Sequence, residues 1–314
     1  YGVWALVFQV LLKGGITAIL IWFVLKWKPN FVFSISSFRK LFSFGSKLLL
    51  SSLMASFSSQ INSLLIGKYI GAKDLGFYSR GIQFSDIVYG IFTSALSNVL
   101  LPGLSPLQDD KEVLVSHTRT IIKTSAVIVI PVFFTLAVLA EPIILVLLTD
   151  KWIAAAPIMQ AFCIGRLISI ISEISINILY VVGKTGLVLK QQYYNIAIRI
   201  VLLLFALQFG IIYIAMAEVL STTIHFFINT YYPGKIMNYG ALKQLKDIFP
   251  IMMSGVLMAV LIIASTYFVE NDILKLCIAP LVAIPSFLGM MYLLKIKEYQ
   301  LILEKVKGLI ASRK

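Results

Sequence analysis

The chain has 314 residues, of which 59% are hydrophobic and only 13% are charged, with a formal net charge of +13. A soluble domain carries about 25% charged residues, and one buried core cannot absorb this much apolar surface, so the composition excludes an ordinary soluble protein. The apolar runs are continuous and about 20 residues or longer, whereas the strands of a transmembrane β-barrel alternate between apolar and polar residues. We therefore expect an all-α polytopic membrane protein.

The apolar runs predict nine membrane-spanning helices, most of them joined by short connectors. The predicted spans are residues 3–25, 41–69, 79–104, 120–148, 154–182, 190–208, 211–232, 247–269 and 273–294. The longer connectors 26–40 and 233–246 mix basic and aromatic residues, which is typical of interfacial amphipathic segments. The tail 295–314 is basic and amphipathic, and we expect it on the membrane surface.

The distribution of lysine and arginine predicts the orientation in the membrane. When connectors are assigned alternately to the two sides, the side of connector 26–40 and of the tail holds 18 basic residues and the other side holds 5. The positive-inside rule makes the first side cytoplasmic, so Tyr1 lies outside and Lys314 inside. A missed span would reverse the later connectors, so the asymmetry supports the count of nine. Because the chain starts at Tyr1 within an apolar run, we expect the later part of a longer protein.

Basic side chains inside the predicted spans are the first candidate site residues. Lys13, Arg166 and Arg199 fall near mid-span, where a charge costs on the order of 3 kcal/mol unless it is paired or hydrated. Lys47 lies near a span end, where its long side chain can reach the interface. These cations form interhelical ion pairs that fix packing, for example Arg166 or Arg199 with Glu218, or line a hydrated cavity that meets an anionic substrate. Both can hold, since a pair can open when the substrate arrives.

Acidic and amide side chains form the second candidate set. Arg166 and Glu173 are seven residues apart and therefore lie on one helical face. His225 and Asn229 also share a face, and we expect them to serve packing or hydrogen bonding. Other polar residues in the first spans suit a wet cavity or a helix–helix contact better than lipid. The polar or ion-coupling candidates are Asp86, Glu173, Glu218, Gln60, Asn62 and Gln83.

Motifs for catalysis or cofactor binding are missing from the sequence. There is no P-loop signature, no HExxH pair and no nucleophile elbow, and the connectors are too short to hold a catalytic domain. Cys163 and Cys277 lie in separate apolar runs, so neither a disulfide framework nor a metal site is predicted. We expect neither an enzyme nor a bound cofactor, and the basic charge belongs to the membrane surface rather than to nucleic acid.

Seven segments, in order along the chain, resemble the polysaccharide-exporter branch of the multidrug/oligosaccharidyl-lipid/polysaccharide flippase superfamily, which includes Wzx-type flippases. They are YGVWALVFQ (1–9), LFSFGSKLLLSSL (41–53), LIGKYIGAKDLGFYSRGIQF (65–84), VLLPGLSPLQDD (99–110), AEPIILVLLTDKW (140–152), FINTYYPGKIMNYG (227–240) and LKQLKDIFPIM (242–252).

The resemblance implies a MATE-like fold, which has two six-helix lobes and often two extra helices. The implied parts are the last helix of an N-terminal lobe (1–25), a cytoplasmic linker (26–40), a six-helix C-terminal lobe (41–232), a second linker (233–246), two extra transmembrane helices (247–294) and the cytoplasmic tail (295–314). In such proteins the lobes rock about a central cavity and expose it to each side in turn.

The resemblance also implies a function: translocation of undecaprenyl-diphosphate-linked oligosaccharide across the bacterial inner membrane for surface polysaccharide synthesis. The intramembrane cations would then neutralise the diphosphate, and Ser, Asn and Gln side chains would bind sugar hydroxyls. The acidic residues are candidates for a coupling ion, Na⁺ or a proton, and a polysaccharide polymerase is a candidate partner. The alternative is a MATE-like multidrug exporter. A cation exporter should have a mainly acidic cavity, whereas here the mid-span basic residues equal or outnumber the acidic ones, which favours an anionic substrate.

Overall fold

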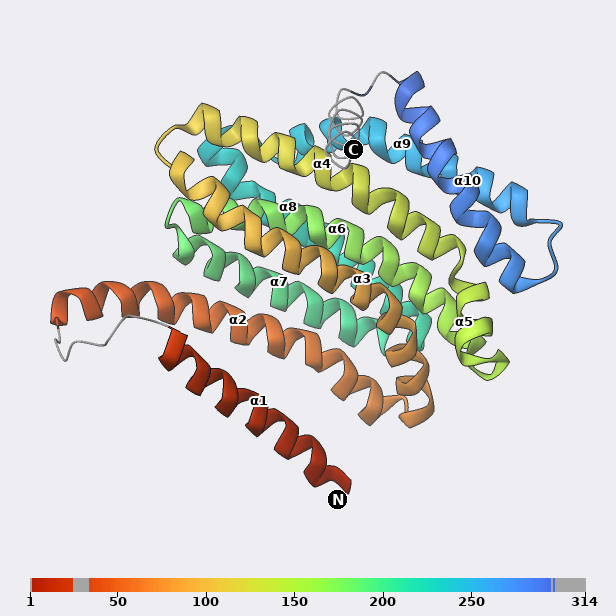
Figure 1. Cartoon of the computed structure of the whole chain (residues 1–314), viewed down its shortest axis with the longest axis horizontal. Coiled ribbons are helices and arrows are strands. Elements are labelled where there is room, and N and C mark those ends of the chain that lie inside the picture. The colour runs from red at the N-terminus through yellow and green to blue at the C-terminus, as the bar shows by residue number, and fades with distance from the viewer. Residues whose placement is uncertain (1, 25–33, 295, 297–314) are drawn as a thin grey trace. The chain divides into compact units, whose positions relative to one another are not determined.

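The computed structural model describes residues 2–24, 34–294 and 296, so the predictions for residues 25–33 and for most of the tail fall outside the described residues. In the described part every regular element is helical (Figure 1). The elements are α1 (Gly2–Val24), α2 (Ile35–Tyr69), α3 (Ala72–Leu104), η1 (Ser105–Leu107), α4 (Lys111–Val138), α5 (Ala140–Leu148), η2 (Asp150–Ala155), α6 (Ala156–Val181), α7 (Thr185–Ala206), α8 (Ile211–Met237), α9 (Ala241–Thr266) and α10 (Asp272–Leu293).

Each of the nine predicted spans overlaps a helix of the structure, which confirms an all-helical fold. Six helical segments of the described part are long and apolar enough to cross a membrane: α3 with η1, α4, α6 with η2, α8, α9 and α10. The full count of nine membrane spans therefore stays a prediction.

Several helices begin before the predicted spans, and at three places the difference changes an expected linker or divides an expected span. Residues 35–40, expected in a linker, are the first turns of α2, because no proline or glycine interrupts the helix there. The expected linker 233–246 is mostly helical: α8 runs through Pro233 to Met237, and the left-handed Asn238 (φ 56°) ends it. The predicted span 120–148 is divided at Leu139, and Pro142 lies in the first turn of α5, where its missing N–H costs nothing.

The chain divides into two compact units, residues 1–45 and 46–314. The first unit contains α1 and the beginning of α2. The second contains the rest of α2 and all later helices, and it holds the candidate site.

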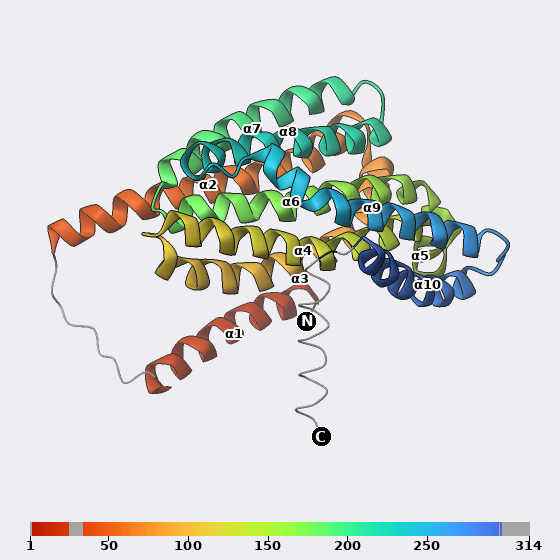
Figure 2. The ribbon, with the colours of Figure 1, turned by 90° about the horizontal axis from the view of Figure 1, so that it is seen from above.

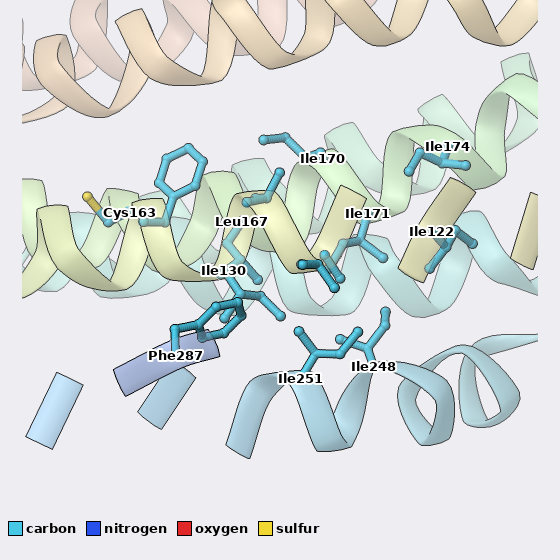
Figure 3. Close-up of a cluster of buried hydrophobic side chains, with 14 of the residues drawn as sticks. Ile122, Ile130, Cys163, Leu167, Ile170, Ile171, Ile174, Ile248, Ile251 and Phe287 are labelled. Atoms are coloured by element: carbon cyan, nitrogen blue, oxygen red, sulfur yellow. The ribbon is translucent and has the colours of Figure 1, made fainter. Parts of the chain in front are cut away.

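Helix α6 is the central element of the second unit. It packs against α8, α3 and α4 (Figures 1 and 2), and it is the most buried of the candidate spans. Its apolar face joins a large core that α4, α9 and α10 complete (Figure 3). Ten of the core residues are Ile122, Ile130, Cys163, Leu167, Ile170, Ile171, Ile174, Ile248, Ile251 and Phe287. The hairpin of α9 and α10 is thereby held against α4, because apolar side chains of the three helices are buried against one another.

A second, smaller core closes the opposite face of the unit near the start of α6. It gathers residues from the ends of α2 and α7 and from the beginnings of α3, α6 and α8. Its largest fully buried member is Tyr78, whose ring meets Phe162 edge to face with centroids 5.5 Å apart. This core seals one end of the space that α2, α3, α6, α7 and α8 enclose.

The joint between α8 and α9 is anchored to α4 by hydrogen bonds. Arg119 on α4 donates from Nε to Oδ2 of Asp247 at 2.6 Å, and the Tyr239 hydroxyl donates to the same oxygen at 2.9 Å. Burial and the nearby carboxylate raise the pKa of Tyr239, so the phenol keeps its proton and remains a donor. These hydrogen bonds fix the position at which α9, and α10 after it, join the bundle.

Candidate functional site

A polar cavity of about 470 Å³ lies inside the second unit, between α2, α3, α6, α7 and α8. Helix α6 supplies its longest wall, through Arg166, Ser169, Glu173, Asn177 and Tyr180. These residues are three or four positions apart, which places them on one helical face. From Arg166 to Tyr180 the wall extends about 21 Å at 1.5 Å per residue. The apolar face of α6 points the other way, into the large core.

Two further polar stripes face this wall. Helix α7 contributes Gln192, Asn195 and Arg199, and α8 contributes Thr222, His225 and Asn229. Both stripes again follow the helical repeat. Three adjacent helices of an otherwise apolar bundle thus direct their polar faces to one space, as expected for helices that line a hydrated cavity.

The Arg166 guanidinium is held between a carboxylate and two aromatic rings. Its Nε donates to Oδ1 of Asp86 at 2.6 Å. Its carbon lies 4.8 Å from the centre of the Tyr89 ring and 5.5 Å from that of Phe162, within cation–π range. The Tyr89 hydroxyl donates to Oε2 of Glu173 at 3.2 Å. Tyr89 therefore connects Arg166 and Glu173, two turns apart on α6.

A second charged group closes the cavity next to the smaller core. Arg199 on α7 forms an ion pair with Glu218 on α8. Asn62 on α2 donates from Nδ2 to Glu218 Oε2 at 3.2 Å and lies 3.1 Å from the Tyr78 hydroxyl. Asn62, Tyr78 and Glu218 are all buried, so this layer is a hydrogen-bonded floor made by four helices.

The structure brings together six of the ten candidate site residues that the sequence singled out. Three of them line the cavity: Arg166, Arg199 and Glu173. Asp86 and Glu218 each pair with one of the arginines, and Asn62 donates a hydrogen bond to Glu218. Gln60 and Gln83 are exposed, and Gln83 accepts a bond from Arg80 at 2.7 Å. Lys13 belongs to the first unit, and the side chain of Lys47 lies outside the described part.

The predicted ion pair of Arg199 with Glu218 is confirmed, and the alternative pair of Arg166 with Glu218 is wrong. Glu218 pairs with Arg199, as the sequence suggested, while Arg166 pairs with Asp86 instead. The reason is helix order: α6 packs along α3, which carries Asp86, and α7 packs along α8, which carries Glu218.

Several cavity residues do not stand out in the sequence. The sequence did not single out Tyr89, Ser172, Asn177 or Asn195. His225 and Asn229, which were expected to pack or to form hydrogen bonds, also line the cavity. The polar spacing of three and four residues along 166–180, 192–199 and 222–229 carried this signal. Within the described residues, no group of His, Cys, Asp and Glu is arranged to hold a metal ion.

The charges around the cavity are nearly balanced. Three carboxylates (Asp86, Glu173 and Glu218) surround two guanidinium groups, and each arginine already has an acidic partner. An anionic ligand must therefore compete with a carboxylate, and it would reach Arg166 more readily. The side chains of the Arg166–Asp86 pair are 23% and 41% exposed, whereas those of Arg199–Glu218 are 16% and 9% exposed.

Comparisons with known proteins agree with the predicted resemblance. The chain is 28% identical over 181 residues to the teichuronic acid biosynthesis protein TuaB of Bacillus subtilis, an alignment covering 57% of this chain and 37% of TuaB. It is 29% identical over 169 residues to the succinoglycan biosynthesis transport protein ExoT of Rhizobium meliloti, covering 53% and 34% respectively. The chain spans about a third of the length of these curated relatives.

The fold is that of a known flippase. The structure of the lipid II flippase MurJ in an inward closed conformation superposes with a TM-score of 0.68 at 19% identity, covering 86% of this chain and 57% of that one. A family model described as polysaccharide biosynthesis protein matches residues 1–157. Since the match extends over half of the chain, the protein belongs to the polysaccharide biosynthesis protein family.

Proposed function

We propose that this protein is a flippase that moves undecaprenyl-diphosphate-linked oligosaccharide from the cytoplasmic to the outer leaflet of the bacterial inner membrane. The observation that carries the proposal is the polar cavity with two arginines, enclosed by apolar helices in a member of this family. A diphosphate cannot cross hydrocarbon without a polar path and a compensating charge. ExoT is named a transport protein and MurJ a lipid II flippase, which supports a transport role rather than catalysis.

Arg166 is the residue best placed to receive the first phosphate. Its pair with Asp86 is partly exposed, so a phosphate can replace the carboxylate without first entering a sealed core. Guanidinium forms paired hydrogen bonds to phosphate oxygens, and the rings of Tyr89 and Phe162 hold the arginine in position during the exchange. Arg199, deeper in the cavity, stabilises the same charge electrostatically.

Transport would follow alternating access. In this proposal residues 41–232 form a six-helix C-terminal lobe, 1–25 the last helix of an N-terminal lobe and 247–294 two added helices. The charge distribution favours a cytoplasmic C-terminus with the Tyr1 end outside. A polysaccharide polymerase would receive the translocated unit on the outer side.

A second candidate function is cation-coupled export of cationic drugs on the same fold. It is favoured by Glu173, which accepts a bond from Tyr89 and has no cationic partner among the described residues. A carboxylate of this kind suits either a coupling ion or a positively charged substrate. The flippase remains the better proposal, because the family and the relatives concern polysaccharide synthesis.

Complementation separates the two functions. The complete gene is expressed in a bacterium that lacks its own capsule or O-antigen flippase, and surface polysaccharide and the leaflet distribution of lipid-linked repeat units are measured. The Arg166→Ala variant is compared with Lys275→Ala, which removes a cation paired with Asp272 outside the cavity.

Restored polymer with the wild type and Lys275→Ala, but not with Arg166→Ala, is the result expected of a flippase. Ethidium efflux without restored polymer would instead establish the drug exporter. Normal polymer with Arg166→Ala would remove the phosphate role of that residue.

A further inference from the structure

A directed chain of hydrogen bonds crosses the cavity wall from α7 to α8 to α6. Asn195 donates from Nδ2 to Oδ1 of Asn229 at 3.0 Å, and Asn229 donates from its own Nδ2 to Oγ of Ser172 at 2.8 Å. In this arrangement the amide nitrogen of Asn195 faces Asn229, so the carbonyl oxygen of Asn195 is not used in that contact. Oδ1 of Asn195 is therefore an acceptor. It is buried, and none of the described residues donates to it.

The imidazole of His225 is oriented by a backbone carbonyl. Its Nε2 lies 2.9 Å from the backbone oxygen of Asn195, and a carbonyl oxygen can only accept. Nε2 therefore carries the proton, and in the neutral ring Nδ1 is an acceptor. No described residue donates to Nδ1, and His225 lines the cavity. Asn195 and His225 thus contribute two neighbouring acceptors from two helices.

Asn177 and Glu173 on α6 also present acceptors to the cavity. Asn177 uses its Nδ2 to donate to the backbone oxygen of Glu173 at 2.9 Å, which leaves its Oδ1 for a ligand. Glu173 is a carboxylate and accepts from Tyr89. A phosphate, which has acceptor oxygens and a negative charge, is disfavoured beside these four acceptors and favoured at the two arginines. A group rich in O–H donors is favoured.

We propose that Asn195 and His225 form a hydroxyl-recognising subsite for the sugar attached to the diphosphate. This assignment rests on the proposed flippase function and states where the sugar lies relative to the diphosphate. Asn195 is one helical turn from Arg199, about 6 Å along α7. When the phosphates lie at the arginines, the first sugar lies against the acceptors, and its hydroxyls donate to Oδ1 of Asn195 and Nδ1 of His225. The subsite thereby makes the cavity select glycosylated lipid over bare lipid diphosphate.

Binding of two probes to the purified full-length protein in nanodiscs tests this assignment. The probes are undecaprenyl diphosphate and undecaprenyl diphosphate carrying one glucose. The main variant is His225→Gln, whose amide can still donate to the Asn195 carbonyl but has no acceptor at the Nδ1 position. Asn195→Leu removes the other acceptor at similar volume. Tyr194→Phe removes a hydroxyl from an exposed side chain next to Asn195 and is the matched control.

Wild type and Tyr194→Phe should bind the glycosylated probe more tightly than the bare one. His225→Gln and Asn195→Leu should each reduce this preference by roughly three- to tenfold, with binding of the bare diphosphate unchanged. If Asn195→Leu does not fold, His225→Gln alone decides. An unchanged preference in His225→Gln, or no preference in the wild type, overturns the subsite and leaves the flippase proposal standing. Failure of the wild type to bind either probe overturns the flippase proposal together with the subsite.

Discussion

Arg199 on α7 and Glu218 on α8, 19 residues apart in the sequence, form an ion pair at the sealed end of the polar cavity. Their side chains are only 16% and 9% exposed. Asn62 supplies a further hydrogen bond to the carboxylate at 3.2 Å. The pair is thus a structural part of the cavity floor as well as a source of charge.

Removal of one partner from this pair should destabilise the protein. Arg199→Ala leaves the buried Glu218 carboxylate without its cation, and we expect a loss of about 3 kcal/mol in stability. Arg199→Met combined with Glu218→Gln should recover most of this loss, because no unpaired charge remains and Asn62 keeps an acceptor. Thermal unfolding of detergent-solubilised protein measures both. Lys275→Ala breaks a more exposed pair and should cost less than about 1 kcal/mol. Equal stability of Arg199→Ala and wild type would contradict a structural role for the pair.

Removal of the carboxylate beside Arg166 should strengthen phosphate binding. In Asp86→Asn the guanidinium no longer has an anionic competitor, while Tyr89 and Phe162 still hold it. We expect the affinity for undecaprenyl diphosphate to rise about fivefold, since a partly exposed pair contributes about 1 kcal/mol. Asp272→Asn, which changes a carboxylate paired with Lys275 outside the cavity, is the control. A lower affinity in Asp86→Asn would show that the acid itself is part of the binding site.

The contact between α3 and α6 depends on a glycine. A Cβ on Gly81 would come within 2.8 Å of the Ala155 backbone oxygen and of Ile158. Gly81→Ala must therefore push the helices apart, and we expect a loss of about 1–3 kcal/mol. On the same helix Gly90→Ala meets no atom within 4 Å, and it should be neutral or slightly stabilising. Comparing the unfolding temperatures of the two variants tests the packing, and a Gly81→Ala protein as stable as Gly90→Ala would speak against it.

The predicted orientation can be tested by cysteine labelling in intact cells. Lys111 is the first residue of α4, on the predicted cytoplasmic side, and Lys151 lies in η2, on the predicted opposite side. Lys111→Cys should react only with a membrane-permeant maleimide, and Lys151→Cys should also react with an impermeant one. Both are made in a background without Cys163 and Cys277. The reverse labelling pattern would invert the topology.

The helices and the family were predictable because their signals are local. Long apolar runs become helices in lipid, where every backbone polar group must be satisfied within its own segment. The ends of those runs were less predictable. Pro233 and residues 35–40 lie inside helices, since a helix can extend beyond the apolar run that marks it.

Half of the candidate site could also be predicted. A buried charge is costly enough to stand out in an apolar run, which singled out Arg166, Arg199, Glu173 and Glu218. Neutral residues such as Asn195 and Ser172 carry no such signal one at a time. Their role becomes visible only when three stripes with the helical repeat are considered together.

Composition, run length and local motifs were enough to identify a helical membrane protein of the polysaccharide biosynthesis family, because none of them depends on how helices meet. Which charges pair became clear only from the packed helices, since a helical stripe fixes a face but not its neighbour. The fold joined Arg166 to Asp86 rather than to Glu218, placed Gln60 and Gln83 on the surface, and brought Asn195 and His225 to one wall. The physical reason is that interhelical packing, set by apolar contacts on the opposite faces, selects which polar faces share a cavity.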